Sequence, residues 1–243
     1  MVTDGPMSDG RVHLALFDID GTLVRGGSIV RTLFEESLLD VFGRAGALNS
    51  YDFSGKTDPQ IVTELMRGAG LAETEIEQKL PSFRDVYLER LEERLQNDDL
   101  QLLPQVNELL AELRAIGVAL GLVTGNWEGG ARIKLSRVDL NRYFEFGAFG
   151  DGHPDRMTLP PVALDNAEAS TGRRYEPGET VIIGDTPLDV ECAHRHGIRS
   201  IAVATGWKST TELEAAGATW VLEDLAAAYE IEPLFAPRQS TEL

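Results

Sequence analysis

The stretch Arg11-Val-His-Leu-Ala-Leu-Phe17, followed directly by Asp18-Ile-Asp20-Gly21-Thr22, carries the fold signal from which the rest of the chain can be interpreted. Its first part is a short apolar run, and its second part places two acids and a glycine where that run ends. Short apolar runs bounded by glycine or polar residues are typical of strands that are buried on both faces of a parallel sheet. We therefore expect a strand that ends in a turn carrying Asp18 and Asp20.

Similar apolar runs recur along the chain, at residues 118–124, 180–184, 200–204 and 218–222. Segments that suit helices separate them, at residues 104–117, 129–138, 160–171 and 188–196. Strands that alternate with helices predict an α/β fold with a doubly wound, mostly parallel sheet. Ligands of such sheets bind at the carboxyl ends of the strands, so the acids after Phe17 lie where a site is expected.

A long stretch without a strand pattern, residues 24–102, separates the first two runs. Its apolar spacing predicts helices over residues 28–43 and 81–95, and Asp58 is expected to cap a third helix that stops near Gly68 or Gly70. A connection of this size is too long for a loop. We predict an inserted helical cap over residues 24–102, a catalytic core formed by 11–23 and 103–230, and flexible tails at 1–10 and 231–243.

The composition restricts the partners of this protein. Its 243 residues include 22 Lys and Arg against 40 Asp and Glu, a net charge of −18, which repels nucleic acid and anionic membranes. No apolar run approaches the roughly 20 residues of a membrane span, and the first ten residues lack the features of a secretory signal. The single cysteine, Cys192, suits a buried thiol in a reducing compartment. We expect a cytoplasmic monomer or homodimer that binds a small molecule.

Two acidic pairs follow apolar strands, Asp18 with Asp20 and Asp185 with Asp189. If both strands are central and parallel, their four carboxylates converge at one edge of the sheet. Such a cluster raises its own pKa values unless a cation neutralises it, and oxygen ligands suit Mg²⁺. Each acid alone could be a helix cap or turn residue. The joint placement, with the polar Thr124-Gly125-Asn126 at a third strand end, favours a site.

These motifs match those of a known family in order and spacing. Asp18-Ile-Asp20-Gly21-Thr22, Thr124 within Leu122-Val-Thr-Gly-Asn126, and Gly184-Asp185-Thr-Pro-Leu-Asp189 resemble the phosphatases of the haloacid dehalogenase (HAD) superfamily. The resemblance spans about residues 12–222, and the helical insertion resembles the type-one cap of the phosphoglycolate-phosphatase-like branch. It implies a HAD-like Rossmannoid core and an Mg²⁺-dependent phosphatase that hydrolyses a small phosphate monoester.

The resemblance also implies roles for individual residues. Asp18 would attack phosphorus and form an aspartyl-phosphate, and Asp20 would act as general acid and base. Mg²⁺ would be held by the Asp18 carboxylate, the Asp20 backbone carbonyl and Asp185, with Asp189 binding through water or supporting the ligands from behind. Thr124 would hold phosphoryl oxygens. The neighbouring residues expected at the substrate are Gly21, Thr22, Gly125 and Asn126.

The cation of the third family motif has two candidates in this sequence. Arg156 stands where the family usually shows Lys-Pro, and Lys134 lies on the helix expected after Thr124. Either could stabilise the charge that develops during phosphoryl transfer. We favour Arg156. His153, nearby, is expected to be an ordinary loop histidine.

The segment Ser54-Gly55-Lys56-Thr57 resembles the end of a nucleotide-binding phosphate loop. That motif requires a glycine where Ser50 stands and a preceding strand that is not expected here, so we reject a nucleotide hydrolase. The segment more plausibly forms a cap loop that faces the active site. Lys56 could then contact the leaving group of the substrate, or it could be an exposed lysine beside a helix start.

Other functions were weighed against a phosphatase. A dehalogenase of the same superfamily is disfavoured because Asp20 is present. A phosphomutase shares all the motifs, although residues 24–102 contain no histidine that could serve as its additional acid–base group. A regulator that binds a phosphometabolite without turnover is disfavoured by the intact pair of Asp18 and Asp20.

Overall fold

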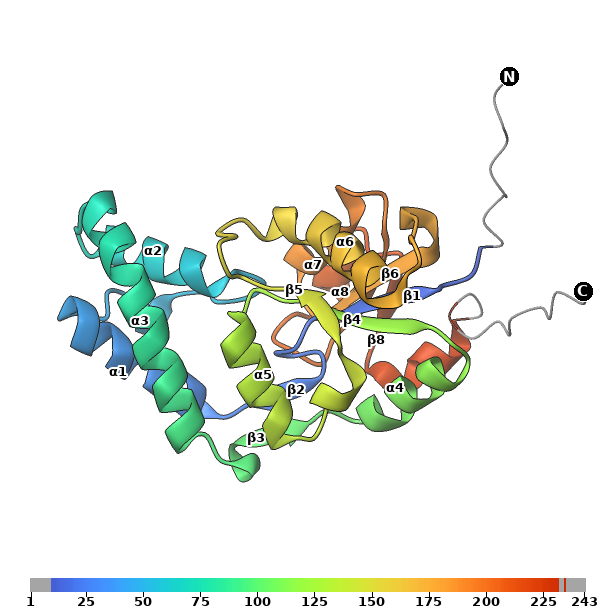
Figure 1. Cartoon of the computed structure of the whole chain (residues 1–243), viewed down its shortest axis with the longest axis horizontal. Helices are drawn as coiled ribbons and strands as arrows, with labels where there is room; N and C mark the ends of the chain where they lie inside the picture. The colour runs from blue at the N-terminus through green and yellow to red at the C-terminus, as the bar shows by residue number, and fades with distance from the viewer. Residues whose placement is uncertain (1–9, 232–233, 235–243) are drawn as a thin grey trace, which may run out of the picture.

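The core of the protein is a six-stranded parallel sheet in the order β5–β4–β1–β6–β7–β8 (Figure 1). The computed structural model describes residues 10–231 and residue 234. The strands are β1 (Leu14–Phe17), β4 (Ala119–Val123), β5 (Phe146–Ala148), β6 (Thr180–Gly184), β7 (Arg199–Val203) and β8 (Trp220–Leu222). The predicted α/β fold with a doubly wound parallel sheet is confirmed.

Helices cover both faces of this sheet. The helices are α4 (Val106–Ala115), α5 (Glu128–Arg137), α6 (Leu159–Thr171) and α7 (Pro187–His194). Side chains alternate along a strand, so Ala15 and Phe17 of β1 join the hydrophobic cluster of α4 and α5. Leu14 and Leu16 join the cluster of α6 and α7 on the other face. Both faces of β1 are therefore buried, which explains its continuous apolar sequence.

The sequence interpretation missed two short elements of the core. Strand β5 has only three residues, Phe-Gly-Ala, at one edge of the sheet, and so few residues give no periodic signal. Helix α8 (Thr210–Ala215) has six residues and is capped by the preceding Ser209, whose hydroxyl accepts from the Glu212 amide. Short 3₁₀ helices are present at Leu48–Ser50, Asn97–Asp99, Asn141–Tyr143, Arg156–Thr158, Pro177–Glu179 and Leu225–Glu230.

The insertion after β1 consists mainly of helices α1 (Ser28–Phe42), α2 (Asp58–Gly68) and α3 (Glu73–Arg94). The expectation that it contains no strand was wrong, because β2 (Val24–Gly26) and β3 (Leu100–Leu102) pair antiparallel at its two ends. Each has three residues, too few for an alternating pattern. This ribbon brings the entry and exit of the insertion together.

Helix α3 begins eight residues before the predicted start at residue 81, so that Pro81 lies inside the helix. An internal proline removes one backbone hydrogen bond and normally marks a helix boundary. Here the apolar face formed by Ile76, Phe83 and Tyr87 is buried against α1 and α2, and this burial offsets the lost hydrogen bond. Tertiary packing therefore overrides the local signal.

Core and cap also share side chains. Trp127, which precedes α5, is 3% exposed and belongs to the hydrophobic cluster of the cap, with its ring centroid 5.9 Å from that of Phe83 and 6.2 Å from that of Tyr87. Further along α5, Arg137 donates to the backbone carbonyls of Leu95 and Glu92 at the end of α3. Helices α3 and α5 run side by side in Figure 1. The inserted helices thus pack along α5 in this structure.

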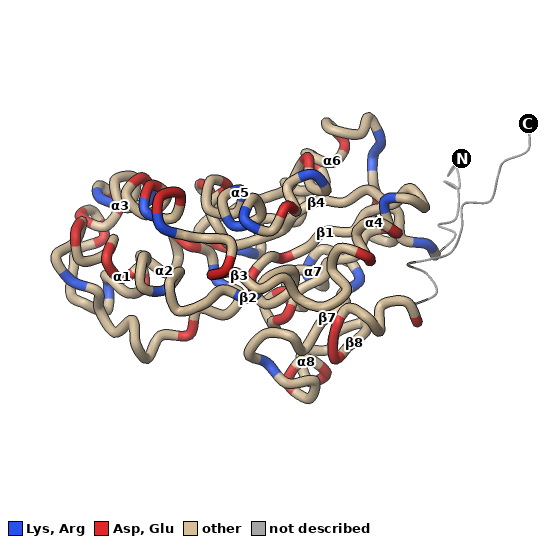
Figure 2. The backbone as a smooth tube through the Cα atoms, turned by 90° about the horizontal axis from the view of Figure 1, so that it is seen from below, with Lys and Arg blue, Asp and Glu red and all other residues tan. Residues whose placement is uncertain are grey.

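Most of the two expected tails lies outside the described residues, but Ile231 and Leu234 are buried in the core cluster. Acidic residues are spread over the inserted helices and the core (Figure 2). Among the described helices, none combines the length and the apolar character needed to cross a membrane.

Candidate active site

The strand order places three chain segments at one edge of the sheet. β1 lies between β4 and β6, with Phe17 in register with Leu122 and Ile183. The residues that follow these strands, Asp18, Thr124 and Asp185, therefore meet at the carboxyl edge. All three are at most 5% exposed. The topology therefore brings residues of three separate motifs together, as the sequence predicts.

Three carboxylates form the centre of this site. Asp18, Asp185 and Asp189 each offer an oxygen, and these oxygens all lie within 4.8 Å of one another. Burial raises the pKa of Asp18 to about 6, an effect that the guanidinium of Arg156 opposes. Burial, with the charges of Asp189 and Asp18, raises the pKa of Asp185 to about 9. The cluster therefore resists full ionisation unless a positive charge joins it.

Asp185 has the features of a cation ligand. Its Oδ1 atom is buried and has no hydrogen-bond partner, a costly state for a carboxylate oxygen. Two glycines press against the same side chain: a Cβ atom would lie 2.3 Å from Asp185 Oδ2 if built on Gly21 and 1.6 Å if built on Gly206. The site thus has carboxylate oxygens without enough donors, and the residues fit a hard divalent ion such as Mg²⁺.

Gly206 was missed in the sequence analysis. It lies just after β7, in the segment Ala204-Thr-Gly-Trp207. The sequence signal that could have revealed it is a glycine at the end of another strand. The preceding Thr205 donates its hydroxyl to the carbonyl of Gly21 at 2.6 Å. This loop therefore braces the turn that follows Asp18.

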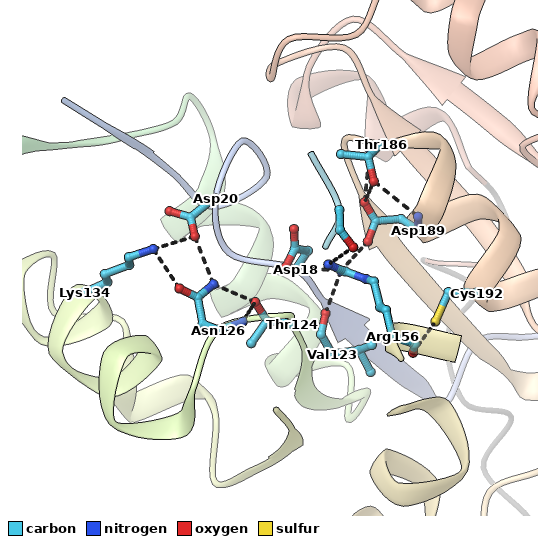
Figure 3. A network of polar contacts seen from close by, with 11 residues as sticks. Asp18, Asp20, Val123, Thr124, Asn126, Lys134, Arg156, Thr186, Asp189 and Cys192 are labelled. Atoms are coloured by element: carbon cyan, nitrogen blue, oxygen red, sulfur yellow. Dashed lines mark hydrogen bonds and ion pairs between the residues drawn. The ribbon is translucent and has the colours of Figure 1, made fainter. Parts of the chain in front are cut away.

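Arg156 is buried against the acidic cluster (Figure 3). Its Nη2 atom lies 3.3 Å from Asp18 Oδ1 and also forms an ion pair with Asp189. The same nitrogen donates to the Val123 carbonyl at 3.2 Å, and Nη1 donates to the Gly55 carbonyl of the insertion at 3.2 Å. Of the two cations expected to compete for one role, Arg156 is the one beside Asp18.

Lys134 lies in a different part of the site, on the other side of Asp18 in Figure 3. Its ammonium donates to Asp20 Oδ2 at 2.6 Å and to Asn126 Oδ1 at 2.7 Å. Asn126 in turn donates from Nδ2 to Asp20 Oδ2 and to the Thr124 hydroxyl, both at 2.9 Å. The structure therefore brings both candidate cations into the site, each with its own carboxylate.

The expected convergence of four carboxylates was wrong in one respect, because Asp20 does not join the other three. The strand ends at Phe17, and Gly21 with φ of +86° turns the chain, so the alternation that would align Asp20 with Asp18 does not continue. Its carboxylate turns to Lys134 and Asn126 instead. Thr22, two residues on, is buried with an unpartnered hydroxyl.

Asp189 is held at both oxygens. Oδ1 meets Arg156, and Oδ2 accepts from the Thr186 hydroxyl at 2.6 Å and the Thr186 amide at 3.0 Å. The Thr186 hydroxyl also accepts from the Asp189 amide, which completes a capping box at the start of α7. Asp189 thus serves as a helix-capping residue and as part of the acidic cluster.

The 55–58 segment of the insertion contacts the loops of this site. The Asp58 amide donates to the Gly125 carbonyl at 2.8 Å, and the Asp58 carboxylate accepts from the Trp127 amide at 2.9 Å. Burial raises the pKa of Asp58 to about 7, which the nearby Lys134 opposes. Asp58 was expected to cap α2, but Thr57 is the N-cap, since its hydroxyl accepts from the Gln60 amide.

Lys56 shows a different environment from the one expected for a substrate contact. Its ammonium pairs with Glu64 at 2.7 Å and donates to the Tyr51 hydroxyl at 3.0 Å, both within the cap. Burial would raise the pKa of Glu64, but hydrogen bonds from Lys56 and Tyr51 lower it to about 2. The backbone of Lys56, in contrast, packs directly on Gly125.

Substitution of Gly125 by alanine should disturb the contact between cap and core. An added Cβ would lie 2.1 Å from the Lys56 carbonyl oxygen and 2.8 Å from the Cα of Thr57, both backbone atoms that cannot rotate away. We expect Gly125→Ala to reduce kcat/KM by about 10²-fold, because a displacement of the order of 1 Å in a site has that effect. Steady-state kinetics on an aryl phosphate ester would measure it.

Gly68→Ala is the matched control for this variant. Gly68 is the last residue of α2, and a Cβ there meets no atom within 4 Å, so activity should be unchanged. Wild-type activity in Gly125→Ala would show that the cap tolerates displacement and does not need this close approach.

Two residues remain from the sequence analysis. His153 lies away from the acidic cluster, and Cys192 is a buried thiol. His153 lines a cavity of about 570 Å³ between α2, α3 and the loop 151–155, which Asp18 does not line. The buried thiol of Cys192 donates to the Arg156 carbonyl, and burial raises its pKa to about 12. The expectation of a buried cysteine is confirmed.

Comparison with known proteins agrees with this geometry. A family model described as haloacid dehalogenase-like hydrolase matches residues 15–203. Phosphoglycolate phosphatase 1 of Pseudomonas aeruginosa is 28% identical over 219 residues, covering 88% of this chain and 77% of that protein. The phosphoglycolate phosphatase of Synechococcus elongatus is 29% identical over 210 residues, covering 86% and 91%.

Solved structures show the same fold. A predicted phosphoglycolate phosphatase from Haemophilus somnus superposes with a TM-score of 0.67 at 23% identity, over 90% of this chain and 97% of that one. CbbY from Rhodobacter sphaeroides, solved in complex with phosphate, gives a TM-score of 0.66 at 19% identity, over 88% and 95%. The sequence motifs, the strand order and the family match lead to one conclusion. This chain belongs to the haloacid dehalogenase-like hydrolases, in the branch that resembles phosphoglycolate phosphatases.

Proposed function

We propose that this hydrolase is an Mg²⁺-dependent phosphatase that cleaves a small phosphate monoester through an aspartyl-phosphate on Asp18. One observation carries the proposal: Asp18 is buried at the end of β1, 3.3 Å from the guanidinium of Arg156 and within a cluster of carboxylates that needs a cation. This combination provides a nucleophile together with positive charge for the transferred group.

Asp18 is suited to nucleophilic attack once it is ionised. Burial is the main cause that raises its pKa to about 6, so a cation beside it favours the carboxylate form that attacks phosphorus. Arg156 is placed to stabilise negative charge on the phosphoryl oxygens during transfer. Thr124, with the amides of the loop before α5, is proposed to hold the same oxygens.

Asp20 is proposed to serve as general acid and then as general base. Its side chain is 43% exposed, in contrast to the buried Asp18, so it can reach a leaving group that enters from solvent. It would protonate the departing alkoxide and later take a proton from the water that hydrolyses the aspartyl-phosphate. Asp18 would thus attack phosphorus, and Asp20 would transfer the protons.

The residues that would hold Mg²⁺ are Asp18, Asp185 and the Asp20 carbonyl, with Asp189 acting through water or as support. When bound, the ion supplies charge neutralisation and orientation of the phosphoryl group. The orphaned Asp185 oxygen supports this assignment. Asp189 is the weaker ligand candidate, because Thr186 and Arg156 already occupy both of its oxygens.

The substrate is proposed to be a small phosphorylated metabolite, and phosphoglycolate is the first compound to test because the similar curated proteins carry that name. The cap, residues 24–102, is proposed to select the leaving group. Gly21, Thr22, Gly125 and Asn126 would line the phosphoryl side. Location in the cytoplasm remains a prediction from the single cysteine.

Removal of divalent cations tests the proposal most directly. We expect EDTA to abolish phosphate release and Mg²⁺ to restore it, because the carboxylate cluster then lacks its counter-charge. Protons compete with the ion for Asp18 and Asp185, whose pKa values are raised to about 6 and about 9. The Mg²⁺ concentration that gives half-maximal activity should therefore fall as the pH rises between these values.

Two further readouts separate the outcomes. Mg²⁺ should raise the melting temperature even without substrate, since it binds the folded state. A panel of phosphometabolites, including phosphoglycolate and a hexose phosphate, should show which leaving group is preferred. Full activity in EDTA would contradict the metal requirement, and transfer of phosphate within a sugar without release would favour a mutase.

A further inference from the structure

The second buried cation of the site, Lys134, has no part in the function proposed above. It lies on α5, its side chain is 5% exposed, and its ammonium is 2.6 Å from Asp20 Oδ2. A buried ammonium is costly unless its protons meet acceptors. The chain therefore places a buried positive charge next to the carboxylate of Asp20, which is proposed to transfer protons.

The partners of Lys134 fix the orientation of a neighbouring amide. Lys134 can only donate, so the Asn126 atom at 2.7 Å must be the acceptor Oδ1. The Nδ2 atom of Asn126 is then free to donate to Asp20 Oδ2 and to the Thr124 hydroxyl. The amide and the ammonium thus form one connected unit with the two polar residues at the ends of β1 and β4.

Both donors meet the same oxygen of Asp20. Lys134 and Asn126 bind Oδ2, at 2.6 Å and 2.9 Å, while the side chain as a whole remains 43% exposed. Holding one oxygen fixes the carboxylate and leaves the other oxygen, Oδ1, outside these two contacts. A rotatable side chain is thereby held in one orientation before a substrate binds.

Arg156 cannot replace this function. Its contacts are to Asp18, Asp189 and two backbone carbonyls, and it lies on the opposite side of Asp18 from Lys134 in Figure 3. The two cations contact different carboxylates: Arg156 contacts the proposed nucleophile Asp18, and Lys134 contacts Asp20.

We propose that Lys134, together with Asn126, is a positioning residue that holds Asp20 with Oδ1 toward the leaving group. This inference rests on the proposed phosphatase activity.

A series of leaving groups tests the positioning role. Departure of 4-nitrophenolate needs little help from an acid, whereas departure of a simple alkoxide needs protonation. We expect Lys134→Met to lower kcat/KM for an alkyl phosphate by about 10²-fold or more, the usual range for general acid catalysis, and for 4-nitrophenyl phosphate much less. The parameter kcat/KM is chosen because it includes leaving-group departure but not the later hydrolysis of the aspartyl-phosphate.

A double-mutant cycle shows whether Lys134 acts through Asp20. In an Asp20→Asn background, Lys134→Met should cost little further activity toward the alkyl phosphate, since the group that it positions is gone. Lys134→Gln, which keeps a polar donor without the charge, provides a second variant if Lys134→Met folds poorly. Arg132→Met is the matched control, because it removes a cation from the same helix whose side-chain contacts are to Glu128, the Phe144 carbonyl and the ring of Phe149.

The outcomes are distinguishable. Equal losses of kcat/KM for both esters, repeated in full in the Asp20→Asn background, would show a merely structural role and overturn the inference. Absence of phosphate release by the wild-type enzyme on every ester would instead count against the proposed function. A loss confined to the alkyl phosphate and absent without Asp20 is the result that the structure leads us to expect.

Discussion

Asp18→Asn should abolish phosphate release, with kcat/KM lower by about 10⁴-fold or more, because an amide cannot attack phosphorus and form the covalent intermediate. The substitution keeps the size of the side chain. The ionised form of Asp18 is disfavoured in the folded protein, as its raised pKa of about 6 indicates. A neutral amide at this position should therefore leave the melting temperature unchanged or higher when no cation is present.

The measurement combines phosphate release with thermal unfolding. Asp85→Asn serves as a control, since Asp85 is an exposed acid of α3 that pairs with the neighbouring Arg84. It should retain wild-type activity and stability. Activity of Asp18→Asn within tenfold of the wild type would remove Asp18 from the role of nucleophile and with it the proposed mechanism.

Arg156→Ala is expected to have the second-largest effect, a decrease in kcat of about 10²–10³-fold, as for removal of a single group that stabilises developing charge. Arg156→Lys should retain an intermediate activity. Lysine keeps the positive charge near Asp18 and Asp189, but it lacks the planar fork that also reaches the carbonyls of Val123 and Gly55. The second of these carbonyls belongs to the cap.

The stability of the arginine variants must be measured alongside their activity. Breaking a buried ion pair by removing one partner costs about 3–5 kcal/mol, so Arg156→Ala should melt earlier than the wild type. Mg²⁺ should recover part of this loss, because it supplies another positive charge to the same carboxylates. Arg174→Ala, at an exposed arginine that pairs with Glu176, is the control. Unchanged kcat in folded Arg156→Ala would exclude Arg156 from phosphoryl transfer.

The fold class was predictable because its signals are local. Each strand of a doubly wound sheet is buried on both faces, so β1, β4, β6 and β7 appear in the sequence as short apolar runs. Elements that carry few residues gave no such signal, namely β5, α8 and the ribbon of β2 and β3. The start of α3 was misjudged because burial of its apolar face outweighs the local effect of Pro81.

The sequence alone determined which residues meet at the site, since motifs that follow neighbouring parallel strands must lie at one edge. Only the tertiary structure decided how they divide: Asp185 and Asp189 beside Asp18 and Arg156, and Asp20 turned toward Lys134. The contacts of Asp58, Gly206 and Trp127 were also decided only by the tertiary structure. The physical reason is that side-chain pairing depends on which charges burial forces together, and contacts between residues far apart in the chain leave no periodic pattern in it.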